Sequence, residues 1–266
     1  MSDGPQSPDL PQPAMAAPAG GPPLRPLSGW GTTGWALLAL LAWLAAEAAV
    51  LVAFLLRWFA LNPGAHVDLD KIAHDGRLLA LAAIFATTAQ CGVVILAIRR
   101  TGWPAAAYLG LDRKPRAREV VFCLACVALM LVASDLLSWL SGRELLPPFM
   151  IKVYESARDP GAIALVLVAV AIAAPVGEEV MFRGFLFRGW AASRLGGAGT
   201  IVLTSVIWAA IHTQYDWFGM AQIFCLGLLF GWVRWRSGST ALTMLMHAVT
   251  NVAATIETAV IIEWLS

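Results

Sequence analysis

Seven long apolar runs restrict the fold of this chain more than any other feature. Each run is near the length of about 20 residues that an α-helix needs to cross a bilayer. The chain is 59% hydrophobic and only 13% charged, whereas a soluble domain carries about 25% charged residues. We therefore predict an all-α, polytopic membrane bundle of about seven or eight transmembrane helices. The runs cover residues 35–56, 78–98, 120–141, 162–187, 200–214, 218–235 and 240–262.

The remaining segments give the chain a simple organisation. Residues 1–30 are rich in Pro, Gly and Ala and contain no apolar run, so we expect a disordered tail followed by one membrane domain over 31–266. The loop 142–161 mixes charged and apolar residues, which favours a short helix at the membrane surface. The net charge of +1 gives no sign of nucleic-acid binding. The run 200–214 is short and leads into Thr213-Gln214-Tyr215-Asp216, so it is either a span followed by a tight turn outside the membrane or part of a re-entrant pair with 218–235.

The distribution of Lys and Arg predicts the orientation. Cytoplasmic loops of membrane proteins carry an excess of these residues. By alternation of the spans, eleven of them fall on one side and six on the other. We expect the side with eleven to be cytoplasmic, so that the N-terminus lies inside and the C-terminus outside. The eleven are Arg25, Arg99, Arg100, Arg113, Lys114, Arg116, Arg118, Arg188, Arg194, Arg234 and Arg236.

Two adjacent carboxylates, Glu178 and Glu179, follow an apolar stretch within the fourth run. A charged side chain in the hydrocarbon costs about 2.5 kcal/mol or more, so such residues usually have a partner or a function. Glu179 and Arg183 are four residues apart and share a helix face, which predicts an ion pair. Glu178 points about 100° away and has no partner on its own helix. We expect Glu179 and Arg183 to be structural or orienting, and Glu178 to be available for chemistry.

Three further polar residues lie in apolar helices of the C-terminal half: His212, His247 and Asn251. His247 and Asn251 are four residues apart and share a helix face. At about 1.5 Å per residue, Glu178, His212, His247 and Asn251 lie roughly 15, 18, 10 and 17 Å from the cytoplasmic ends of their spans. Unrelated polar residues would scatter through a hydrocarbon core about 30 Å thick. We therefore expect the four to form one polar layer.

The residue types in this layer suit hydrolysis. A desolvated glutamate can take a proton from water, and a nearby histidine can share that task. A second histidine and an asparagine amide can donate to a developing oxyanion. Alternatively, Glu178, His212 and His247 could ligate a zinc ion that activates its bound water. The His-Glu-x-x-His signature of zinc helices is absent from the sequence.

These motifs resemble those of the CPBP family of intramembrane proteases, which includes CAAX proteases and bacteriocin-processing enzymes. The family motifs are EExxxR, FxxxH and HxxxN, in that order, and the resemblance covers residues 162–255. The single departure is Trp208 in place of Phe, an aromatic exchange that we expect not to affect catalysis. In this chain the motifs are Glu178-Glu179-x-x-x-Arg183, Trp208-x-x-x-His212 and His247-x-x-x-Asn251.

The resemblance implies an intramembrane endopeptidase with a cleft inside a helical bundle. It assigns water activation to Glu178 and His212, oxyanion binding to His247 and Asn251, and an orienting role to Glu179 and Arg183. The implied substrate is a peptide or protein with a cleavage site near the bilayer, including lipidated ones. The family has been labelled metalloprotease, but a metal-free glutamate mechanism uses every motif residue, so we favour no cofactor and keep zinc as the alternative.

The same residues allow two other functions besides proteolysis. The chain could be a non-catalytic immunity or scaffold protein that binds a peptide or partner helix. A transporter is disfavoured because interrupted helices should then appear in both halves. We expect an integral protein of the bacterial inner membrane, with the cleft toward the cytoplasmic half. Glu47 and Asp135 are further intramembrane acids without an assigned role.

Overall fold

The computed structural model describes residues 24–64 and 66–265, and its described residues form helices and no strand. Six helices or helical segments are long and apolar enough to cross a membrane, and a shorter apolar helix accompanies them. The predicted all-α membrane bundle is confirmed, and each predicted run coincides with one helical segment. The segments are α1 (Gly29–Leu61), α3 (Gly76–Arg99), α5 (Ala117–Leu140), Pro160–Ala191, α10 (Gly196–Ala210), α11 (Trp217–Ser237) and α12 (Thr240–Val260), the last of which continues to Leu265 as a π-helical turn.

Three short helices lie between the long ones. They are α2 (Leu69–Ala73), α4 (Ala105–Leu109) and α6 (Pro148–Ser156). The short helix expected within the loop 142–161 is therefore present as α6. Residues 1–23 of the predicted N-terminal tail lie outside the described residues, and α1 begins at Gly29 within the predicted tail boundary.

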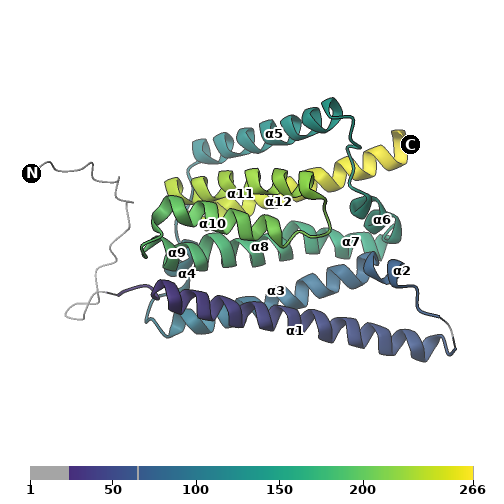
Figure 1. Cartoon of the computed structure of the whole chain (residues 1–266), viewed down its shortest axis with the longest axis horizontal. Helices are drawn as coiled ribbons and strands as arrows, with labels where there is room; N and C mark the ends of the chain where they lie inside the picture. The colour runs from purple at the N-terminus through teal and green to yellow at the C-terminus, as the bar shows by residue number, and fades with distance from the viewer. Residues whose placement is uncertain (1–23, 65, 266) are drawn as a thin grey trace, which may run out of the picture.

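The long helices run alongside one another, with α1 and α5 at opposite edges of the bundle (Figure 1). Helix α1 packs mainly on α3, and α10 packs on α11. Helix α12 lies at the centre, where it contacts α5, α11 and the segment Pro160–Ala191. Helix α5 is mostly exposed and contacts the bundle through α11 and α12. The C-terminal half of the chain thus surrounds α12 with the helices that carry the three motifs.

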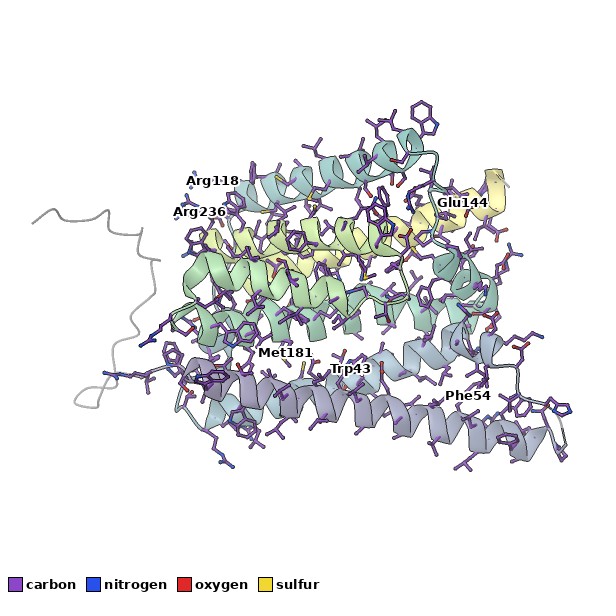
Figure 2. The ribbon with its side chains drawn as sticks, in the orientation of Figure 1. Trp43, Phe54, Arg118, Glu144, Met181 and Arg236 are labelled. Atoms are coloured by element: carbon purple, nitrogen blue, oxygen red, sulfur yellow. The ribbon has the colours of Figure 1, made fainter. Side chains whose placement is uncertain are left out.

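The two ends of the bundle differ in charge. Arg118 and Arg236 lie at one end, and Glu144 lies at the other (Figure 2). The Glu144 end carries ion pairs, including Arg77–Asp159, Arg143–Asp216 and Arg158–Glu263. Within the part of the chain that the structure describes, the arginines of the loop 99–119 form no such pair. The orientation predicted from the Lys and Arg distribution stays a prediction.

The segment Pro160–Ala191 is not a regular α-helix. It consists of α7 (Pro160–Val168), a π-helical turn over Ala169–Ala173, α8 (Ala174–Glu179), a second π-helical turn over Val180–Leu186, and α9 (Phe187–Ala191). Such π-turns are rare and occur frequently at functional sites. Glu179 is the last residue of α8, so the two carboxylates lie between the two π-turns.

Side chains from neighbouring helices bind the backbone of this irregular segment. In a bilayer, freed backbone carbonyls must find donors within the protein. Four carbonyl oxygens of the segment accept hydrogen bonds from side chains of α3, α11 and α12, and these bonds hold the segment in place. They are Asn251 Nδ2 to Val170 (2.8 Å), Thr87 Oγ1 to Ala173 (3.1 Å), Gln90 Nε2 to Gly177 (2.8 Å) and Arg234 Nε to Arg183 (2.8 Å).

Gly177 allows the close approach of α3 next to the two carboxylates. A Cβ atom at this position would lie 2.6 Å from the hydroxyl oxygen of Thr87. Any larger residue would therefore push α3 away and break the neighbouring bond from Gln90. The glycine directly before Glu178 is explained by this packing.

Candidate functional site

Glu179 and Arg183 form the ion pair that their spacing predicts. The Arg183 Nη1 atom lies 2.8 Å from Oε1 of Glu179, and both side chains are almost completely buried. Arg183 also donates to the carbonyl oxygen of Gly227, at 3.3 Å. Its guanidinium carbon lies 4.5 Å from the centre of the Trp208 ring, which is a cation–π contact. The pair therefore joins the segment Pro160–Ala191, which we call the site segment, to α10 and α11.

His247 is a second partner of the same carboxylate oxygen. Its Nδ1 atom lies 3.2 Å from Oε1 of Glu179, and the residue is 4% exposed. A carboxylate accepts hydrogen bonds, so this contact favours a proton on Nδ1. The neutral ring then presents an acceptor at Nε2, and the protonated ring presents a donor there. The sequence predicts Arg183 as the partner of Glu179 because both lie on one helix. It gives no sign of His247 as a second partner, because His247 comes from a different helix.

Glu178 has a partner on another helix. The indole Nε1–H of Trp208 donates a hydrogen bond to Oε2 of Glu178. Trp208 is itself 3% exposed, whereas Glu178 is half-buried. Glu178 lacks a partner on its own helix, as expected, but the carboxylate is not free. Sequence analysis singled out Trp208 only as an aromatic exchange and missed that it brings an N–H donor.

His212 lies in the turn after α10 rather than inside a span. Helix α10 ends at Ala210, so His212 lies beyond the end of the helix, and its depth in the bilayer stays a prediction. The His212 Nδ1 atom lies 2.7 Å from the carbonyl oxygen of Trp208. Because a carbonyl oxygen only accepts, Nδ1 carries the proton and Nε2 of a neutral ring is an acceptor. His212 is thereby prepared to accept a proton or to hold a water molecule.

Asp216 stabilises the end of the turn that carries His212. Asp216 accepts a hydrogen bond from the backbone N–H of Gly219 at 2.9 Å and pairs with Arg143. These two contacts hold the pKa of Asp216 below its ordinary value. Tyr215 stacks on His212 with the ring centres 6.3 Å apart, and partial burial raises its pKa to about 12. The phenol therefore stays neutral beside the imidazole at ordinary pH.

Asn251 is one turn beyond His247 on α12. Its Nδ2 atom donates to the Val170 carbonyl oxygen, at 2.8 Å. An amide nitrogen has two hydrogens, so one donor and the carbonyl oxygen of the side chain remain available. The bond also fixes the rotation of the amide toward the site segment.

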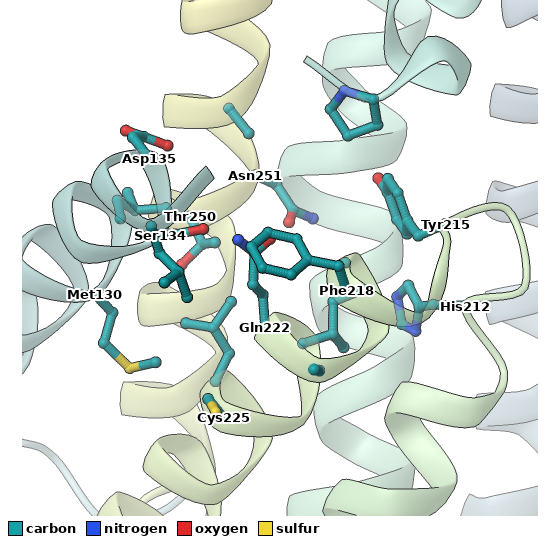
Figure 3. Close-up of a pocket in the computed structure, with 18 of the residues that line it drawn as sticks. Met130, Ser134, Asp135, His212, Tyr215, Phe218, Gln222, Cys225, Thr250 and Asn251 are labelled. Carbon is teal, nitrogen blue, oxygen red and sulfur yellow. The ribbon is translucent and has the colours of Figure 1, made fainter. Parts of the chain in front are cut away.

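A cavity of about 420 Å³ lies beside His212, His247 and Asn251. It lies between α5, α11 and α12 and extends to the loop after α5 and to the turn after α10. Figure 3 shows His212 beside Tyr215 and Asn251 near Thr250 around this space. Trp208, His212, His247 and Asn251 line it, whereas neither Glu178 nor Glu179 does so among the described residues. Three of the four predicted catalytic residues thus share one cavity, and Glu178 reaches its edge through Trp208.

Comparisons with known proteins indicate a family for the part of the chain that carries the three motifs. Residues 160–253 match the family described as "Type II CAAX prenyl endopeptidase Rce1-like". This segment belongs to the CAAX protease family. A stretch of 105 residues is also 35% identical to an "Uncharacterized 24.3 kDa protein" of Escherichia coli, which covers 38% of this chain and 46% of that protein. The chain thus spans about half the length of this relative. No solved structure matches this chain.

The CAAX protease match confirms the family that the three motifs indicated, and all six polar motif side chains fall within the matched segment. It supports a membrane-embedded endopeptidase in general, acting on a peptide or protein substrate. It does not assign a role to any residue. The roles of the six side chains are therefore argued from their geometry below.

Zinc held by Glu178, His212 and His247 is the second chemistry that the sequence allows. Over residues 24–64 and 66–265, no three His, Cys, Asp or Glu side chains are placed to bind one metal ion. The Nδ1 atom of His247 is directed at Glu179, and the carboxylate of Glu178 accepts from Trp208. The residues as arranged do not fit a zinc site.

The cavity lies at the end of the bundle opposite to the basic loop. Its lining includes Leu145 and Pro147 from the loop after α5, Met150 from α6, and Tyr215 from the turn after α10. Both connections are at the Glu144 end (Figure 2), whereas the loop 99–119 is at the other. A cytoplasmic loop 99–119 and a cleft in the cytoplasmic half are therefore incompatible expectations. If the Lys and Arg distribution sets the orientation, the cavity opens on the outer side.

Proposed function

We propose that this chain is a metal-free intramembrane endopeptidase that hydrolyses a peptide bond close to the membrane surface. The observation that carries the proposal is the cavity on which His212, His247 and Asn251 meet, with Glu178 held at its edge by Trp208. The family match adds independent support for peptide-bond hydrolysis. The location proposed for the protein is a bacterial inner membrane.

Glu178 and His212 activate the water in this proposal. Glu178 takes a proton from a water molecule that also donates to Nε2 of His212, and the hydroxide attacks the carbonyl carbon of the scissile bond. The free Nε2 of His212 follows from the bond between its Nδ1–H and the Trp208 carbonyl oxygen. The proton on Glu178 is then delivered to the leaving nitrogen as the C–N bond breaks. Water is consumed, and a carboxylic acid and an amine are released.

His247 and Asn251 stabilise the oxyanion that forms during the attack. Asn251 offers its second N–H, since the first is bound to Val170. His247 can donate from Nε2 only as an imidazolium, and in that form its Nδ1–H would donate to the carboxylate of Glu179. Arg183 shares the same carboxylate oxygen and keeps it in position. Glu179 and Arg183 thus act on the oxyanion through His247.

The cavity walls support a substrate that enters from the membrane. They are mainly apolar and lie between helices long enough to cross the bilayer. An extended peptide with aliphatic side chains, or one carrying a lipid chain, fits such a surface. The polar side chains of Ser134, Gln222 and Thr250 on the walls can bond to its backbone.

The test compares C-terminal peptides from cells that carry the wild-type chain, Glu178→Gln, or no chain. We expect new peptide termini with the wild type that disappear with Glu178→Gln at equal protein level. Glu155→Gln, which changes an exposed glutamate of α6, is the matched control and should behave as wild type. A non-catalytic immunity or scaffold role predicts no new termini and a phenotype that survives Glu178→Gln.

A further inference from the structure

We infer that Trp208 positions the general base: its indole N–H holds Oε2 of Glu178 and leaves Oε1 as the atom that takes the proton from water. This inference rests on the proposed function and adds a residue to its machinery. The motif pattern that the chain resembles has a phenylalanine here, and phenylalanine has no donor. In this chain, therefore, the aromatic exchange changes chemistry as well as shape.

The burial of Trp208 fixes the direction of its N–H. The residue is 3% exposed and packs between both histidines, with ring centres 5.4 Å from His212 and 5.3 Å from His247. The centre of the Phe230 ring lies 5.8 Å from that of Trp208, and the guanidinium carbon of Arg183 lies 4.5 Å from the centre of the Trp208 ring. A ring held on several sides has little freedom to rotate, so its hydrogen bond imposes one orientation on the Glu178 carboxylate.

The same residue also fixes the second water-binding group. The backbone carbonyl of Trp208 accepts from Nδ1 of His212, and the indole of Trp208 donates to Glu178. Two groups of one residue thus set the distance between the base and the histidine. Because a small misplacement of reacting groups costs a large factor in rate, this coupling matters more than the strength of either bond.

The first experiment needs no substrate. Full-length protein labelled with ¹⁵N at the tryptophan indoles is measured in detergent micelles, and Trp208→Phe identifies the Trp208 signal. We expect Glu178→Gln to move this signal, because a carboxylate acceptor becomes a neutral amide, and Glu155→Gln to leave it unchanged. A Trp208 signal that does not respond to Glu178→Gln would overturn the inference.

The second experiment measures kcat and KM on a peptide that the wild type cleaves. We expect Trp208→Phe to lower kcat about 10- to 100-fold with KM nearly unchanged, the usual effect of losing a residue that orients a reacting group. Trp208 replaced by 3-benzothienylalanine, which keeps the ring size and lacks the N–H, should show the same loss.

A matched control separates this role from a general loss of packing. Trp190 donates its indole N–H to the hydroxyl of Thr33 at 3.1 Å, away from the cavity. Trp190→Phe loses a comparable bond and should keep the wild-type kcat. Wild-type kcat in the benzothienyl variant would overturn the inference and leave the proposed function intact. No cleavage by the wild type would overturn both, although the indole signal would still report whether the contact exists.

Discussion

The Nδ1 atom of His247 lies 3.2 Å from Oε1 of Glu179, the oxygen that also accepts a hydrogen bond from Arg183 at 2.8 Å. One buried carboxylate thus joins a guanidinium to an imidazole from a different helix. The arrangement makes Glu179 the centre of the buried network, while Glu178, one residue earlier, faces Trp208. Adjacent glutamates therefore have separate tasks.

Removal of the cation should damage the fold as well as the activity. Arg183→Ala leaves the Glu179 charge buried without its main partner, and breaking such a pair costs about 3–5 kcal/mol. We expect a lower protein level and a lower melting temperature in detergent. Glu178→Gln should remove activity with a melting temperature close to wild type. If Arg183→Ala melts like the wild type, the structural assignment of the pair is wrong.

Loss of the amide on α12 should slow the reaction far more than it weakens the fold, although the bond to the Val170 carbonyl oxygen is lost with it. Asn251→Ala removes one oxyanion donor, and we expect a fall in kcat of roughly 100- to 1000-fold. Thr255→Ala, one turn further along α12, removes a hydroxyl that bonds only within its own helix and is the control. A larger effect on KM than on kcat for Asn251→Ala would place this residue in substrate binding instead.

Chelation distinguishes the two chemistries that the motifs allow. Without a metal, purified protein should retain its activity after exhaustive dialysis against a chelator, and its zinc content should be well below one per chain. The structural reason is that Glu178, His212 and His247 are directed at other partners within the described chain. Stoichiometric zinc, together with activity lost on removal and regained on return, would establish the zinc mechanism.

Cysteine labelling in intact cells tests the orientation. In a chain whose four cysteines are replaced by alanine, Gln214→Cys lies in the turn next to His212, and Lys114→Cys lies in the basic loop. We expect a membrane-impermeant maleimide to label Gln214→Cys in intact cells, and Lys114→Cys only after permeabilisation. The reverse pattern would show that the cavity opens toward the cytoplasm and that the Lys and Arg distribution is misleading here.

Sequence analysis was most successful where a single helix contains all the information. The apolar runs predict the helices because length and composition suffice, and the spacing of Glu179 and Arg183 predicts their pair because both lie on one segment. The contacts of Trp208 with Glu178 and of His247 with Glu179 join different helices, and they depend on how those helices pack. A turn at residues 213–216 was one of two alternatives that the sequence allowed, but it did not show that α10 ends before His212, because apolar residues continue to Ile211.

The two π-turns of the site segment tie its function to its length. A single residue removed from Ala169–Ala173 would let that turn close as an ordinary α-turn, so a membrane-spanning helix would persist. The residues before the deletion would, however, rotate by about 100° relative to the two glutamates. The Val170 carbonyl would then leave Asn251, while Glu178 remained beside Trp208. Insertions and deletions in this stretch are therefore expected to leave the helical bundle intact while they disrupt the site.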